Sequence, residues 1–243
     1  MLPVLVILMS LFAMQTCKSV IETDEDLEKI LRNRGLTLDE AQEAYNYIET
    51  NKKVNVVFES GQLCLTIAAN FRAWALGQSP ADVIPESVII FNTLIRDLIK
   101  LPEFDPNIMY GSLQSTYLHE LNILKNESMV QQLLARGANP KICDQNGRNA
   151  FHEAIYQGAE EAVEILYEHD KSLLQIKTQE KQPQTPIELA QSTLKKFKGG
   201  KKPSLSRIAS LQRIEAFLLI QNLITLLTGL QQKLRALATA IGD

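Results

Sequence analysis

The chain has 243 residues, and 45% of them are apolar, which is enough to bury the core of one or two domains. Aromatic residues make up only 6% and leucine and alanine are abundant, a composition that favours helices over a β-sandwich or barrel. The net charge of −3 gives no overall attraction for nucleic acid. Cys17, Cys64 and Cys143 lie far apart, with neither metal-ligand spacing nor the pattern of a disulfide framework. We therefore expect an all-α protein that binds neither nucleic acid nor metal.

Residues 1–19 form a hydrophobic leader. The run from Leu2 to Met14 is almost wholly apolar, too short to span a bilayer and about the length of a signal-peptide core. No Lys or Arg precedes it, and no small-x-small cleavage site follows it. Three interpretations stay open: an export signal, a retained membrane anchor, and a buried segment. The first predicts an exported or secreted protein, and the others predict a membrane-associated or cytoplasmic one.

The sequence from 20 to 104 predicts a helical N-terminal region, with a degenerate repeat within it as one interpretation. Two helix starts carry cap signals, Thr23 before three acidic residues and Thr37 before Glu40. The first of these helices should end near Gly35. Apolar periodicity predicts two further helices, over 62–76 and 86–101. The run 54–58 fits either a strand or a turn of helix.

Residues 105–194 contain an internal repeat with a period of 33 residues. Thr116-Tyr117-Leu118-His119-Glu120 is echoed by Asn149-Ala150-Phe151-His152-Glu153. Behind each, Val130 and Leu133-Leu134 are echoed by Val163 and Leu166-Tyr167. A third start follows at Thr185-Pro186-Ile187-Glu188, where Thr suits an N-cap and Pro suits the first helical position. Such a period, with two short helices and a turn in each unit, indicates stacked helical hairpins.

These residues resemble ankyrin repeats, whose first helix starts with the signature T-P-L-H. Tyr117 and Ala150 replace the Pro of that signature, and Glu188 replaces the His. The clear resemblance covers about residues 105–190 and extends to 90–220 if degenerate ends are included, as terminal repeats are often atypical. It implies an all-α fold, a short ankyrin-type helical-hairpin solenoid with a helical N-terminal layer and a long C-terminal helix. It also implies that His119 and His152 are structural.

The second repeat gives the sharpest local predictions. The residues from Asp144 to Gly147 have turn composition, and Asn149 suits the N-cap of a helix that ends at Gln157 before Gly158. A second helix should span about 160–168. Asp170 then takes the place that Gly137 fills one repeat earlier, which predicts a left-handed residue at that position.

After the repeats, residues 195–207 form a basic linker and residues 208–243 a Leu-rich helix. The linker fits either a solvated loop or a contact with an anionic partner. In the helix, Ile220, Leu227, Leu234 and Ile241 recur every seven residues, as do Leu223, Leu230 and Leu237. Three roles stay open: capping the last repeat, pairing with another helix in a homo-oligomer, and membrane contact.

The sequence shows no catalytic motif. It lacks a glycine-rich phosphate loop, an H-E-x-x-H motif, a C-x-x-C pair and a serine elbow. We therefore predict a non-enzymatic protein without catalytic residues, metal or cofactor.

The resemblance implies that partners contact the turn tips and the exposed face of the first helices. We expect an adaptor that binds another protein; with an export signal, the setting would be a secreted, bacterial-effector-like protein. The alternative is a membrane-tethered or self-associating scaffold that acts through its hydrophobic terminal helices. The predicted partner-binding residues are Ile123, Leu124, Gln145, Asn146, Arg148, Tyr156, Gln157, Lys181 and Gln182.

Overall fold

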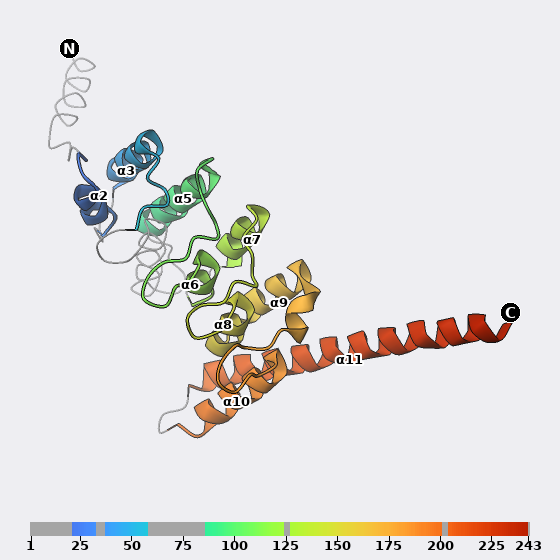
Figure 1. The fold of residues 1–243 in the computed structure, drawn as a ribbon. Helices are drawn as coiled ribbons and strands as arrows, with labels where there is room; N and C mark the ends of the chain where they lie inside the picture. The colour runs from blue at the N-terminus through green and yellow to red at the C-terminus, as the bar shows by residue number, and fades with distance from the viewer. Residues whose placement is uncertain (1–20, 33–36, 58–85, 124–126, 201–203, 243) are drawn as a thin grey trace, which may run out of the picture. The chain divides into compact units, whose positions relative to one another are not determined.

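The computed structural model describes residues 21–32, 37–57, 86–123, 127–200 and 204–242. The chain is divided into two compact units, one over residues 1–104 and the other over residues 105–243. The described residues form helices joined by turns and loops (Figure 1). The hydrophobic leader and the helix predicted over 62–76 lie outside the described residues.

The first unit contains α2 (Asp24–Leu31), α3 (Leu38–Asn51) and α5 (Glu86–Lys100). Both predicted caps are present as reciprocal capping boxes, in which Thr23 pairs with Asp26 and Thr37 pairs with Glu40. The helix α2 ends at Leu31, before the predicted end near Gly35, and residues 33–36 lie outside the described part.

Apolar side chains on one face of each helix form the core of this unit. Leu27 and Leu31 of α2, Ile48 of α3, and Ile95 and Leu98 of α5 are fully or almost fully buried. Of the run 54–58, which fitted either a strand or a turn of helix, residues 54 and 55 form a turn with Val54 buried, Val57 makes a single β-bridge, and Phe58 lies outside the described part.

The second unit consists of helical hairpins stacked side by side. The first helices of successive hairpins, α6, α8 and α10, pack against one another in one row, and the second helices, α7, α9 and α11, pack in a parallel row. This two-row stack is the predicted solenoid (Figure 1). Its elements are α6 (Tyr117–Ile123), α7 (Glu127–Ala135), α8 (Ala150–Gln157), α9 (Glu160–His169), the 3-10 helix η1 (Lys171–Gln175), α10 (Pro186–Lys198) and α11 (Leu205–Gly242).

The predicted cap residues define the ends of these helices. Asn149 caps α8 by accepting from the His152 backbone N–H at 3.0 Å, and α8 ends before Gly158, as predicted. Thr185 caps α10, with Pro186 as its first residue. Between the two rows, apolar residues at the repeat positions are fully buried; they include Val130, Leu133, Phe151, Ile155 and Leu166.

The structure corrects one local prediction. Asp170 is not left-handed: its φ is −147°, in the extended region. Its side chain instead accepts from the Ser172 backbone N–H at 2.9 Å and so caps η1, and it also forms an ion pair with Lys141 at 2.8 Å. These contacts lower the pKa of Asp170 to about 2, with the hydrogen bond from Lys141 as the main cause. The helix α9 therefore ends at an extended residue whose carboxylate caps η1, and not at the left-handed residue that the sequence predicted.

The basic linker is shorter than its composition suggests. Residues 195–198 form the last turn of α10, and α11 begins at Leu205. Lys195, Lys196 and Lys198 therefore lie at a helix C-terminus, where positive charge stabilises the exposed carbonyl groups.

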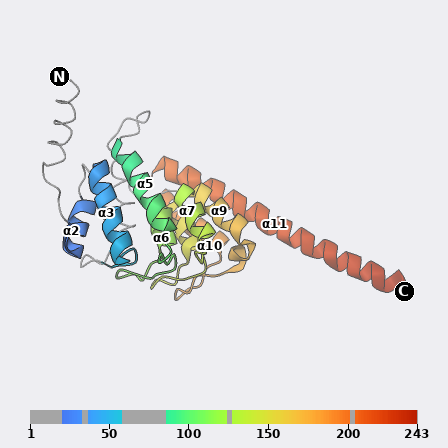
Figure 2. The same ribbon diagram turned by 90° about the horizontal axis from the view of Figure 1, so that it is seen from above.

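The long helix α11 is buried only in its first part. Leu211, Ile214 and Leu218 pack into the end of the stack, and the Phe217 ring meets the Tyr167 ring edge-on at 5.5 Å. The rest of the helix extends beyond α9 and α10 (Figures 1 and 2). By length and composition alone, residues 205–237 could cross a membrane.

Candidate protein-binding surface

The turn before α8 is fixed by the side chain of Asp144. Its Oδ1 accepts from the backbone N–H groups of Asn146 and Arg148, both at 2.9 Å. The main chain closes the same turn, because Asp144 donates to the Arg148 carbonyl at 2.8 Å and Gly147 donates to the Asp144 carbonyl at 2.9 Å. This Asx turn holds the tip in one conformation.

Backbone hydrogen bonds link neighbouring tips. Gln145 N–H donates to the Leu113 carbonyl at 2.8 Å, and Gln179 N–H donates to the Gly147 carbonyl at 2.7 Å. The approach at Gly147 is so close that a Cβ there would lie 2.6 Å from the Gln179 carbonyl carbon. The φ of Gly147 is +75°, which also disfavours a side chain. The tips therefore form a continuous and rigid strip.

Each signature histidine joins its own helix start to the next tip. The Nδ1 atoms of His119 and His152 accept from the backbone N–H groups of Thr116 and Asn149, both at 3.2 Å. The Nε2 atoms lie 3.0 Å from the carbonyl oxygens of Arg148 and Ile176, which can only accept. Both rings must therefore be neutral, with the proton on Nε2.

Burial favours this neutral form. Desolvation lowers the pKa of both histidines below the ordinary value of 6.5. Because the unfolded chain then binds more protons than the folded one, the stability from these rings is complete above pH 6.5 and decreases as the pH falls below it. The histidines are structural, and their contacts account for the resemblance to the repeat signature.

Glu188 explains why the third repeat can dispense with its histidine. Its carboxylate accepts from the Thr185 backbone N–H at 2.7 Å and from the Thr185 hydroxyl at 2.9 Å, as the Nδ1 atoms do in the earlier repeats. A carboxylate cannot donate to a following tip. Among the described residues no tip follows the hairpin of α10 and α11, so the contact that the Nε2 atoms of His119 and His152 make has no counterpart at Glu188.

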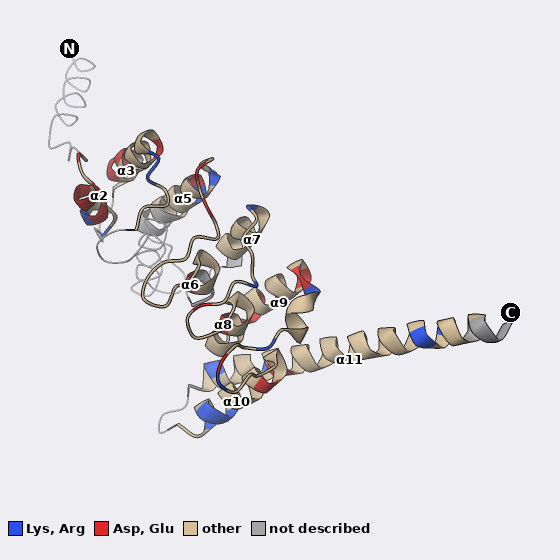
Figure 3. Cartoon of the chain, in the orientation of Figure 1, with Lys and Arg blue, Asp and Glu red and all other residues tan. Residues whose placement is uncertain are grey.

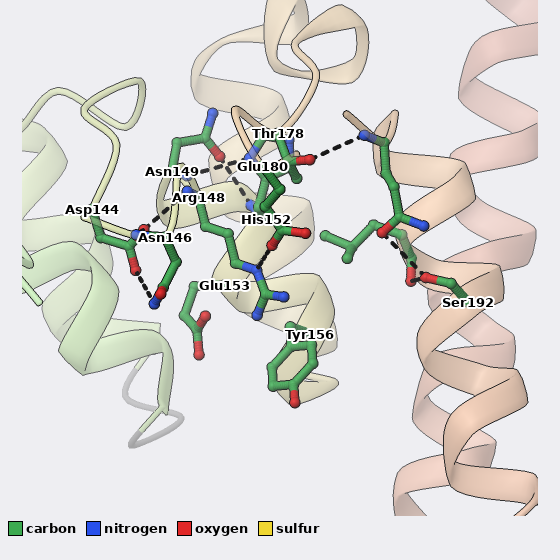
Figure 4. Close-up of polar contacts among 12 residues, drawn as sticks. Asp144, Asn146, Arg148, Asn149, His152, Glu153, Tyr156, Thr178, Glu180 and Ser192 are labelled. Carbon is green, nitrogen blue, oxygen red and sulfur yellow. Dashed lines mark hydrogen bonds and ion pairs between the residues drawn. The ribbon is translucent and has the colours of Figure 1, made fainter. Parts of the chain in front are cut away.

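On the first-helix row, cationic side chains surround one tyrosine. The Arg148 guanidinium lies 4.4 Å from the centre of the Tyr156 ring, between that ring and Glu180 (Figure 4). Arg148 Nε donates to the Glu180 carboxylate at 2.6 Å. Lys196 donates to the Tyr156 hydroxyl at 3.1 Å, and Arg207 donates to the Tyr156 carbonyl at 2.7 Å. The fold brings these groups together from separate elements. Arg148 comes from the turn before α8, Tyr156 from α8, Lys196 from α10 and Arg207 from α11.

The charges of this cluster act on the tyrosine. The hydrogen bond from Lys196 and the nearby charges of Lys196, Arg148 and Arg207 lower the pKa of the Tyr156 phenol. Further along the row, burial and the neighbouring Glu153 raise the pKa of Glu120. The surface is thus basic around Tyr156.

The structure places the predicted binding residues in three groups. Gln145, Asn146, Lys181 and Gln182 are exposed on the tips, whereas Arg148, Tyr156 and Gln157 are half-buried. Gln157 donates to Glu153 and accepts from Arg207. Leu124 and the side chain of Ile123 lie outside the described residues.

Three members of the Tyr156 cluster were missing from the sequence prediction: Glu180, Lys196 and Arg207. Lys196 and Arg207 were noted only as part of a basic stretch, and they lie 40 and 51 residues from Tyr156 in the chain. The repeat period could have placed Glu180, because it lies about one period after Arg148.

Among the described residues, the structure shows no group of three or more His, Cys, Asp or Glu side chains that could hold a metal ion. What it does show is an ordered strip of tips beside a row of first helices, in a stack of helical hairpins. The fold and the surface define a solenoid recognition module.

Comparison with known proteins identifies the hairpins. The family model for ankyrin repeats matches residues 92–196 in three copies, so this part of the chain consists of ankyrin repeats, which are protein–protein interaction modules. The match begins within α5, inside the region 20–104 for which a degenerate repeat was one interpretation.

One relative is the nuclear factor NF-kappa-B p105 subunit of Gallus gallus. It is 27% identical over 149 residues, which cover 57% of this chain. The match spans only 14% of that protein's length.

Proposed function

We propose that this chain is an adaptor that binds a protein partner through its turn tips and the adjoining surface of α8 and α10. The observation that supports this most directly is the strip of tips tied together by backbone hydrogen bonds. Gln145, Asn146, Lys181 and Gln182 project from it and are exposed. A rigid surface loses little conformational entropy on binding, so its contacts contribute to affinity.

The charge around Tyr156 specifies the chemistry of the partner. Arg148, Lys196 and Arg207 place positive charge next to a half-buried aromatic ring, and the exposed Lys195 and Lys198 extend it (Figure 3). Tyr and Arg are enriched among residues that dominate binding energy. We expect the partner to present carboxylates to this region, with an apolar group near Tyr156.

A matched pair of charge reversals tests this proposal. Lys181→Glu changes an exposed tip residue, and Lys171→Glu changes an exposed residue at the start of η1, away from the tips. The partner is first captured from cells of the source organism and its affinity is then measured by calorimetry. We expect Lys181→Glu to weaken binding at least several-fold and to lower its salt dependence, while Lys171→Glu leaves both unchanged. Equal effects of the two substitutions would exclude the tips as the binding surface.

The role of the leader stays a prediction. If residues 1–19 are an export signal, the adaptor acts outside the cell that makes it, as a bacterial effector would. N-terminal sequencing of the protein from culture medium and from the membrane fraction distinguishes a cleaved signal from a retained anchor. The alternative function, a tethered or self-associating scaffold, concerns the terminal helices, of which α11 is the described one.

A further inference from the structure

The second part of α11 carries a broad, exposed apolar stripe. Nine side chains between positions 219 and 237 are each 46–64% exposed. Patches of this kind are rare on monomeric proteins unless they bind something. The nine are Leu219, Ile220, Leu223, Ile224, Leu226, Leu227, Leu230, Leu234 and Leu237.

This stripe does not continue the face that caps the repeats. At 3.6 residues per turn, its centre lies roughly 150° around the helix axis from the buried face formed by Leu211, Ile214 and Leu218. The buried face instead continues into a polar strip that includes Gln221, Thr225, Thr228 and Gln232. The sequence therefore changes the apolar side of α11 at the point where the helix leaves the stack. The hairpins of the same chain cannot cover the stripe of a straight helix.

The period of the stripe indicates another helix as its partner. Apolar residues recur every seven positions from Ile220 to Ile241 and from Leu223 to Leu237, the spacing that keeps a seam facing a neighbouring helix. Leu219, Ile224 and Leu226 widen the seam beyond the two positions per heptad of a simple pair. A wide seam suits a bundle, in which each helix contacts more than one neighbour.

A bilayer fits this segment less well. The residues up to Leu218 are held against the stack, so the uncharged part of the helix that is free extends only from 219 to 232. These fourteen residues span about 21 Å, less than the roughly 30 Å of a hydrocarbon core. A longer span would take in Lys233 and Arg235, and four amide side chains already lie between 221 and 232. The polar strip also lacks the basic residues typical of helices that lie on anionic membranes.

We propose that α11 from Leu219 onward binds the same segment of further copies of this chain, forming a helical bundle that joins two or more repeat stacks. Copies of this chain are the simplest occupant, because each brings the same neutral seam and no charge opposes the pairing before Lys233. Self-association would present several copies of the binding surface on one assembly, which raises avidity for a multivalent partner. This inference does not depend on the identity of the adaptor's partner.

The test compares two double variants of the full chain by multi-angle light scattering. Leu223→Gln/Leu230→Gln changes the stripe, and Thr225→Gln/Thr228→Gln changes the polar strip of the same helix. The parent and the Thr variant should have at least twice the 27.3 kDa mass of one chain, and the Leu variant should have the monomer mass. The Thr variant should retain the thermal unfolding midpoint of the parent, because Thr225 and Thr228 are exposed and lie outside the stripe. The Leu variant should still unfold cooperatively, but at a lower midpoint that does not depend on concentration, because its monomer lacks the stabilisation that assembly gives the parent.

Two results would overturn the proposal. One is a parent that stays monomeric at all concentrations. If that monomeric parent also floats with phosphatidylcholine vesicles and the Leu variant does not, the stripe is a membrane contact instead. The other is self-association that survives in the Leu variant, which would place the contact elsewhere in the chain.

Discussion

The substitution Gly147→Ala, which adds one methyl group, tests whether the close packing of neighbouring tips contributes to stability. In Gly147→Ala, the new Cβ would meet the carbonyl carbon of Gln179 at 2.6 Å and its Cα at 2.9 Å. These are backbone atoms, so no side-chain rotation relieves the contact. The hydrogen bond from Gln179 N–H to the Gly147 carbonyl, now 2.7 Å, must lengthen or break.

The magnitude follows from two contributions. Alanine at a positive φ costs about 1–2 kcal/mol, of which about 0.4–1 kcal/mol is offset by the lower entropy of the unfolded chain. Loss of the linking hydrogen bond adds about 0.5–1.5 kcal/mol. We therefore expect Gly147→Ala to lower the free energy of unfolding by about 2 kcal/mol.

Gly137 provides the matched control. Its φ is +85°, but nothing lies within 4 Å of a Cβ placed there. Gly137→Ala should show only the backbone cost, about 1 kcal/mol or less. Urea unfolding followed by circular dichroism measures both variants. Equal losses at the two glycines would refute the argument, because they would show that the close approach between the tips contributes nothing.

Three further predictions concern the repeats. The Nδ2 of Asn149 is buried and has no hydrogen-bond partner among the described residues, so Asn149→Thr, which keeps a capping oxygen, should raise the free energy of unfolding by about 1 kcal/mol in urea. The free energy of unfolding should fall as the pH drops below 6.5, by up to about 1.4 kcal/mol per pH unit for each of His119 and His152, and His152→Gln should make this slope shallower. Leu166→Ala should cost about 2–5 kcal/mol, whereas Tyr156→Ala should cost about 1 kcal/mol, because Leu166 is fully buried and Tyr156 is half-buried.

Each of these has a result that contradicts it. The reverse exchange, Thr116→Asn, should destabilise, and a stabilising effect would show that the buried amide is not the cause. An unchanged pH slope in His152→Gln would show that its ring is already charged or is not buried in solution. A loss at Tyr156 as large as that at Leu166 would make Tyr156 a core residue and remove it from the proposed binding surface.

The hairpins could be predicted from the sequence because each rests on local chemistry. Asn149 and Thr185 are caps, Pro186 fits a first helical turn, and a 33-residue period places Val163 and Leu166 on a buried face. The cap signals act within a few residues and the period recurs along the linear sequence, so both can be recognised without knowledge of any long-range contact.

Other features depend on contacts between distant residues. Asp170 has the sequence position of a glycine-like helix end, but Lys141 and Ser172 stabilise it in an extended conformation. The Tyr156 cluster requires Lys196 and Arg207 to come together from two different helices. The apolar side of α11 changes at the end of the stack, and the sequence alone does not show where the stack ends.

Site-specific photo-crosslinking tests the adaptor account most directly. A photoreactive amino acid replaces Gln145 or Gln182 on the tips, or Glu161 on the exposed side of α9 as the control. After irradiation in cells of the source organism, the account predicts the same protein partner crosslinked from both tip positions and absent from the Glu161 position. Crosslinking of that partner from Glu161 alone, or with equal yield from all three positions, would contradict binding through the turn tips.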